Sequence, residues 1–187
     1  TDYDRPDSIG KVTGFLGNIG AVVRTHAWIK AMGAEGLKEA AAMAVINNNY
    51  LIKKMLEVPG VDIVNANRAK LQEARFTVEK LFQDTGVTTT DVNRRVVDYG
   101  IVSYFEGHEP MVDPNPITPE PSDSVTVDDL DRFAQVISRV SAEAYADPEI
   151  VKTAPHRCAV HQALEGPLTQ TDQLATTWRA FLKRNPG

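Results

Sequence analysis

A helical pattern interrupted by one glycine runs from residue 17 to residue 58, and it constrains the fold more than any other stretch. Gly33 follows Met32 where a helix-ending glycine takes up the left-handed conformation, and Pro59 with Gly60 ends the pattern. Apolar residues recur at helical spacing on both sides of Gly33: Ile19, Val22, Val23, Ala27 and Ile29 before it, and Leu37, Ala41, Ala44, Val45, Leu51, Ile52 and Met55 after it. The pattern therefore predicts a pair of helices joined at Gly33.

Three consecutive asparagines, Asn47, Asn48 and Asn49, lie inside the second predicted helix. Asparagine is a poor residue for a helix interior because its side chain competes for backbone hydrogen bonds. We therefore expect other parts of the chain to satisfy these amides.

The rest of the chain alternates between strands and helices. Residues 61–64 and 74–78 are typical of short strands, and Thr88 begins a helix that stops before Gly100. Residues 101–105 are typical of a further strand. Helices that cover a small sheet in this way predict an α/β or α+β domain.

Prolines set the limits of the predicted elements in the second half of the chain. Five prolines between residues 106 and 124 predict a loop, because proline forbids a helix and most central strand pairing. Thr126 and Asp129 then form a capping box that begins a long amphipathic helix, and Pro148 closes it. A short helix is expected at residues 173–182, and an extended arm with a short strand near residues 9–15 at the beginning.

Composition narrows the classes of protein that this chain can belong to. Its 187 residues and 42% apolar content suit one domain with a core, and a net charge of −5 argues against nucleic acid as a partner. No apolar run approaches the ~18 residues of a membrane-spanning helix, and no signal peptide is visible. We therefore expect a cytoplasmic protein that binds neither membrane nor nucleic acid.

One short segment carries residues of the type that bind zinc. His156, Cys158 and His161 lie close together, and Cys158 is the single cysteine, so an internal disulfide is impossible. Three candidate ligands in one irregular segment are a weak signal. We therefore expect no metal site.

Several stretches resemble one family. RPDSIGKVTGFLGN from Arg5, the run VVRTHAWIKAMGAEGLKEAAAMAVINNNYL, the triplet Asp98-Tyr99-Gly100 and the triplet Ala154-Pro155-His156 resemble the C-terminal part of glycine dehydrogenase (decarboxylating). This enzyme is the P-protein of the glycine cleavage system, and the likeness is to the second subunit of its split form. The resemblance implies an α/β, aspartate-aminotransferase-like small domain of pyridoxal-phosphate (PLP) fold type I, with long linker helices. It implies an N-terminal arm at 1–16, a linker helix pair at 17–58, a small domain at 59–153 and a tail at 154–187.

The same resemblance implies a PLP-dependent decarboxylase that is shared between chains. In the family the Schiff-base lysine and a glycine-rich segment lie upstream of the matched stretch, so no catalytic residue is expected on this chain, which alone should be inert. The lysine is expected on a homologous N-terminal P-protein-like subunit, in an αβ or α2β2 hetero-oligomer. A lipoyl carrier protein would accept the aminomethyl group.

Five residues are candidates for the site. Gly17 and Asn18 begin the first helix, where free N–H groups and the helix dipole attract phosphate, and they are candidates for PLP binding. The alternative is a plain capped turn. Arg75, His108 and Arg24 are candidates for substrate binding, since arginine pairs bidentately with a carboxylate. A surface role accounts equally well for Arg75, and a structural role for Arg24.

Two departures from the family pattern bear on the substrate. Ala74-Arg75-Phe76 stands where the family has His-Glu-Phe, and residues 106–110, EGHEP, displace the family's histidine. These differences favour a diverged variant in specialised metabolism that acts on another amino acid. The other hypothesis is a non-catalytic binding or regulatory module derived from the same family.

Overall fold

The computed structural model describes residues 17–102, 113–159, 162 and 178–184. Within these ranges helices and short strands follow one another as α1 (Ile19–Met55), β1 (Asp62–Ile63), β2 (Phe76–Thr77), α2 (Glu79–Thr85), α3 (Thr89–Val97), β3 (Pro116–Ile117), α4 (Val127–Ala146), α5 (Pro148–Lys152) and α6 (Trp178–Arg184). The predicted arm, with its strand near residues 9–15, lies outside the described residues.

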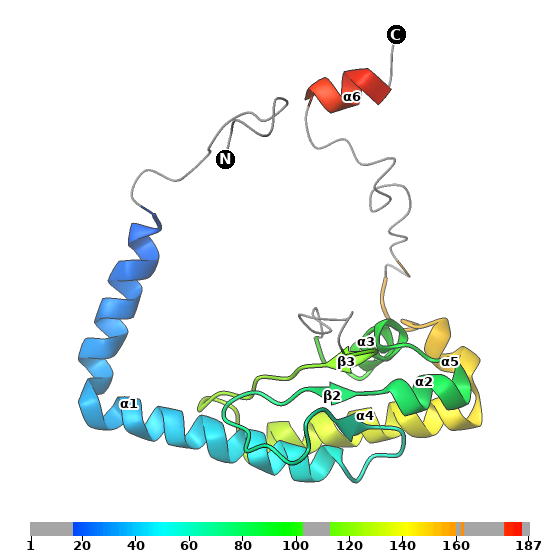
Figure 1. The fold of residues 1–187 in the computed structure, drawn as a ribbon, viewed down its shortest axis with the longest axis horizontal. Helices are drawn as coiled ribbons and strands as arrows, with labels where there is room; N and C mark the ends of the chain where they lie inside the picture. The colour runs from blue at the N-terminus through cyan, green and yellow to red at the C-terminus, as the bar shows by residue number, and fades with distance from the viewer. Residues whose placement is uncertain (1–16, 103–112, 160–161, 163–177, 185–187) are drawn as a thin grey trace.

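Helix α1 is two helices joined at Gly33, as the pattern predicts. Gly33 has φ 63° and ψ −174°, which is not helical, and Figure 1 shows the helix changing direction in this region. The φ is positive as expected, but the ψ is extended instead of left-handed helical. Only glycine adopts this conformation at low cost, because a Cβ would clash with the backbone.

The strands form one antiparallel sheet in the order β1-β2-β3. Phe76 lies at its centre, opposite Ile63 on one side and Ile117 on the other. The predicted strands at residues 61–64 and 74–78 are thus confirmed. Strand β3 lies inside the segment predicted to be a loop, and that prediction was wrong for Pro116 and Ile117. Proline is tolerated there because it is the first residue of an edge strand.

Of the strand expected at residues 101–105, the structure describes only residues 101 and 102, and these two do not form a strand. Ile101 donates its N–H to the carbonyl of Val96, in the last turns of α3, so this group is not available for a sheet. Residues 103–105 lie outside the described ranges.

The predicted starts of the two amphipathic helices are confirmed. Thr88 and Asp91 form a capping box at the start of α3, and Thr126 and Asp129 form another at the start of α4. Pro148 does end α4, but it also opens the short helix α5, with Asp147 as its N-cap. Sequence patterns did not predict α5 or α2, which are five and seven residues long.

Helix α4 organises the core. It packs against α1, α2, α3 and α5, and Figure 1 shows it running alongside the second half of α1. The fully buried larger apolar side chains are Leu51, Met55, Phe76, Val78, Leu81, Val87, Val92, Val96, Val140 and Val151. All of them lie between residue 51 and residue 151, so the core does not use the first half of α1.

The first half of α1 is exposed along its whole length. Val22 and Val23 are each 62% exposed, and Trp28 on another face of the helix is 49% exposed. A helix that is apolar on several faces is normally buried. No helix in the described ranges is long and apolar enough to cross a membrane. This half of α1 is therefore suited to contact with another folded surface.

The asparagine triplet joins α1 to two loops. Asn47 Nδ2 donates to the carbonyls of Ser122 and Val125, at 2.8 and 3.0 Å. Asn48 Nδ2 donates to the carbonyl of Leu71 at 2.8 Å, while Asn49 Nδ2 bonds the carbonyls of Val45 and Lys70. The expectation that other parts of the chain satisfy these amides is confirmed for the three NH2 groups, whereas the Asn48 Oδ1 atom is buried without a hydrogen-bond partner among the described residues.

Candidate functional site

The start of α1 forms a capped turn. Gly17 has φ 84°, and Asn18 Oδ1 accepts a hydrogen bond from the N–H of Ala21 at 3.0 Å. The Asn18 carbonyl also accepts from the N–H of Val22. A phosphate at this helix end would have to compete with Asn18 for the N–H of Ala21. Gly17 leaves room for a ligand, since a Cβ built on it would meet no atom within 4 Å.

The predicted substrate-binding residues lie in different parts of the fold. Arg24 is exposed on the first half of α1, whereas Arg75 lies immediately before β2 in the sheet. Arg75 approaches two carboxylates, with Nε 3.5 Å from Glu73 and NH1 3.4 Å from Asp113. His108 lies outside the described residues. Arg75 would have to exchange one of these carboxylates to bind that of a substrate.

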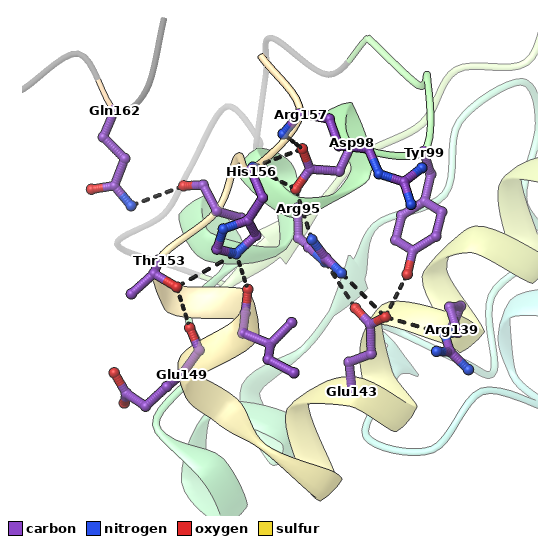
Figure 2. A network of polar contacts seen from close by, with 12 residues as sticks. Arg95, Asp98, Tyr99, Arg139, Glu143, Glu149, Thr153, His156, Arg157 and Gln162 are labelled. Atoms are coloured by element: carbon purple, nitrogen blue, oxygen red, sulfur yellow. Dashed lines mark hydrogen bonds and ion pairs between the residues drawn. The ribbon is translucent and has the colours of Figure 1, made fainter. Parts of the chain in front are cut away.

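A polar network connects α3, α4 and the chain after α5 (Figure 2). Arg95 on α3 contacts Glu143 on α4 with two nitrogens, at 2.8 and 3.3 Å, and Asp98 with NH1 at 2.8 Å. The hydroxyl of Tyr99 donates to Glu143, and Arg139 Nε lies 3.1 Å from the same carboxylate. The pair with Glu143 raises the pKa of Arg95 above its ordinary value. Arg95 therefore remains charged and links α4 to Asp98.

Asp98 is the meeting point of two sequence motifs. Its buried carboxylate accepts the backbone N–H of His156 at 2.8 and 2.9 Å and that of Arg157 at 2.7 Å. Burial alone would raise the pKa of Asp98, but these two N–H groups and Arg95 outweigh it, so the pKa lies below its usual range. The Asp-Tyr-Gly and Ala-Pro-His triplets, far apart in the sequence, are thus joined by hydrogen bonds. Nothing in the local spacing of either triplet predicts this contact.

A pocket of about 470 Å³ lies beside the Asp-Tyr-Gly triplet. Its lining side chains are mostly apolar, and the charged residues on it are Glu120, Asp129 and Arg132. Arg132 donates from NH2 to the carbonyl of Tyr99 at 3.1 Å. Two carboxylates against one guanidinium do not suit a phosphate-bearing cofactor, so this pocket fits an apolar group better than PLP.

Two lysines of the domain are poorly suited to attach PLP. Lys54 lies 3.1 Å from Asp131, and Lys80 lies 2.8 Å from Asp84. The hydrogen bonds to these carboxylates raise the pKa of both lysines. A lysine that forms a Schiff base needs a lowered pKa, since the neutral amine is the nucleophile.

The segment with zinc-type residues has other contacts. His156 Nε2 lies 2.9 Å from the carbonyl of Ile150, Cys158 is exposed, and His161 lies outside the described residues. In the described ranges, no three side chains of the His, Cys, Asp and Glu types come together as a metal site.

These features define a class of protein before any comparison. The described residues form a small antiparallel sheet covered by helices, and a long helix with exposed apolar side chains projects from this domain (Figure 1). A family model described as "Glycine dehydrogenase, C-terminal domain" matches residues 40–158. This is more than half of the chain, and the chain belongs to that family.

Three similar proteins share one name. The chain is 36% identical to "Probable glycine dehydrogenase (decarboxylating) subunit 2" of Thermococcus gammatolerans, over 97% of this chain and 36% of the relative. It is 38% identical to the protein of that name from Pyrococcus horikoshii, over 96% of this chain and 35% of the relative. It is 37% identical to the protein of that name from Thermosipho africanus, over 86% of this chain and 33% of the relative. The chain thus spans about a third of the length of the curated relatives it matches, and the family resemblance seen in its motifs is confirmed.

Proposed function

We propose that this chain acts as the C-terminal part of a PLP-dependent glycine dehydrogenase (decarboxylating), with the Schiff-base lysine on a partner chain that resembles the N-terminal part of the P-protein. The observation that carries the proposal is the match to the relatives over nearly the whole chain, including α1. The fold on this view is the small domain of PLP fold type I.

The exposed first half of α1 supports a partner for the chain. Its large apolar side chains at residues 19–29 are 45–62% exposed on the domain, and a large exposed apolar surface marks a site of interaction. We assign this half of α1 as the surface that packs on the partner, within an αβ or α2β2 assembly. The chain's contribution is then to orient the substrate and to exclude water.

The proposed roles of individual residues follow from their positions. PLP, when bound, supplies the electron sink for the carbanion left by decarboxylation. Gly17 and Asn18 at the start of α1 are the proposed contacts to its phosphate, where the helix dipole favours an anion. Arg75 and Arg24 are proposed to bind the carboxylate of an amino acid, and His108 to line the site. A lipoyl carrier protein is the proposed acceptor of the aminomethyl group.

The substrate of this assembly is proposed to differ from that of the strict glycine enzyme. The resemblance implies that Arg75 stands where the family has an acidic residue, and an arginine in place of a carboxylate would change which substrate charges are accepted. We therefore propose a diverged variant acting on another amino acid in specialised metabolism. Normal lipoyl-dependent exchange of CO2 with glycine by the assembled enzyme would exclude this divergence.

The test is co-expression with a candidate partner that resembles the N-terminal part of the relatives. The visible absorption of the purified complex is compared with that of this chain alone and of the partner alone. We expect the band of lysine-bound PLP in the complex and not in this chain, with a shift when the substrate amino acid is added. Absence of both a copurifying partner and a band would overturn the proposal and favour a non-catalytic binding module.

A further inference from the structure

We propose that the Asp98 carboxylate is a latch that holds chain segment 154–158 against the domain, and that Arg95 couples this latch to Glu143 on α4. We call the contact between the Asp98 carboxylate and the N–H groups of His156 and Arg157 the Asp98 latch. The proposal does not depend on the proposed function.

The latch is the polar contact that ties the segment to α3. Both oxygens of Asp98 are occupied: Oδ1 accepts from the N–H groups of His156 and Arg157, and Oδ2 accepts from Arg95 NH1 and from the N–H of His156. A carboxylate is suited to this position because all its hydrogen bonds are accepted from donors. Asparagine has the same shape but turns an NH2 donor toward at least one of these donors. It should therefore weaken the latch without leaving a cavity.

Other hydrogen bonds of the segment run to α5, its own neighbour in the chain, and to the residues just after it. His156 Nε2 lies 2.9 Å from the carbonyl of Ile150, and Gln162 Nε2 donates to the carbonyls of Lys152 and Ala154 at 2.9 Å each. These bonds satisfy carbonyls in α5 and just after it, and Figure 2 shows His156 and Gln162 to the left of Arg95. They can persist when the latch opens, so the expected change is a local release and not unfolding.

Arg95 connects the Asp98 latch to α4, because it pairs with both Asp98 and Glu143. The guanidinium lies between Asp98 and Glu143, and the side chain of Arg95 is only 13% exposed. Glu143 is itself fixed by Tyr99 and Arg139. If Glu143 is replaced by glutamine, Arg95 loses a charged partner and is held less firmly against Asp98. This variant should loosen the segment less than a change at Asp98.

The experiment uses the single cysteine as a reporter. Cys158 is exposed and follows directly after the latch, so a nitroxide label on it reports the motion of the segment in the 187-residue chain. We expect an immobilised label in the wild type and a mobile one in Asp98→Asn. Cleavage by trypsin after Arg157 should be about 10- to 100-fold faster in this variant, the factor set by losing a charged hydrogen bond. Glu143→Gln should give an intermediate increase.

Controls separate the latch from general effects. Asp128→Asn changes an exposed aspartate on α4 and should leave both readouts unchanged. Should Asp98→Asn fail to fold, Arg157→Pro removes one latch donor, and Arg157→Ala removes the same side chain but keeps the N–H. We expect greater label mobility in Arg157→Pro than in Arg157→Ala. Equal mobility in these two variants, or an unchanged label in folded Asp98→Asn, would overturn the proposal.

Discussion

At the scale of single residues, the asparagine triplet shows how an unfavourable sequence is stabilised by its surroundings. Asn47 and Asn48 are buried in a helix interior, yet each donates its amide to loop carbonyls that a helix cannot satisfy by itself. A residue without a donor would leave these carbonyls without this partner, and an unpaired carbonyl that is shielded from water costs about 1–3 kcal/mol. The triplet is therefore a set of ties between α1 and two loops.

Replacing Asn47 should test this role. Asn47→Ala leaves the carbonyls of Ser122 and Val125 without their donor, so the free energy of unfolding should fall by about 1–3 kcal/mol in urea denaturation. Asn49→Ala is the matched control, because Asn49 is exposed and alanine favours a helix, so its effect should stay below about 1 kcal/mol. Equal losses in the two variants would contradict the role given to Asn47.

At the scale of elements, sequence patterns predicted what is local and missed what depends on distant partners. The break at Gly33 and the capping boxes at Thr88 and Thr126 are confirmed, because each depends only on residues that are neighbours in the sequence. Strand β3 was missed, since only its pairing with β2 makes two proline-flanked residues a strand. At Ile101 a strand was predicted and is absent, because its N–H donates to the carbonyl of Val96 at the end of α3.

The candidate site was predictable only in part, for the same reason. The resemblance marked both Asp98 and His156 as members of matching triplets, but their contact spans 58 positions of sequence. Gly17 and Asn18 were recognised as a helix start, and the structure shows a capped turn there. Their contact with a cofactor stays a prediction, because the spacing of residues along the chain does not specify a ligand.

The first half of α1 should be separable from the domain that follows. Val22→Asp with Ile29→Asp places charges on its exposed face, and we expect binding to the proposed partner to weaken at least about tenfold. The unfolding of the small domain should remain unchanged, because these side chains are exposed. Val127→Asp, at a valine that is 52% exposed on α4, serves as the control and should not weaken binding. Pull-down titration measures the first effect and urea denaturation the second.

At the scale of the whole molecule, carboxylates with lowered pKa link stability to pH. Hydrogen bonds or ion pairs favour the charged form of five acidic residues, for which the pKa lies below the ordinary value: Asp84, Asp98, Asp129, Asp131 and Glu143. For Asp98 and Glu143 burial acts in the opposite direction but is outweighed. A folded-state pKa below the unfolded one gives stability that is present at higher pH and lost as pH falls through the folded pKa.

The expected outcome is a loss of stability below about pH 4, where an unfolded aspartate begins to bind protons. Urea denaturation between about pH 3 and about pH 7 measures it, with stability level above about pH 5. Asp98→Asn should be less stable at neutral pH but should lose less on acidification, because it removes one of the titrating groups. A wild-type midpoint that does not change between about pH 5 and about pH 3 would contradict the prediction.

The position of the core has a consequence for biosynthesis. The buried side chains extend to Val151, whereas the apolar first half of α1 comes before all of them in the chain. A ribosome adds ~5–20 residues per second, so this helix leaves the exit tunnel several seconds before the core can close. Closure of the core does not cover its apolar faces either, because they are exposed on the folded domain. Co-translational capture by the proposed partner or by a chaperone would shield these faces, and synthesis of the two chains from adjacent genes would shorten the wait.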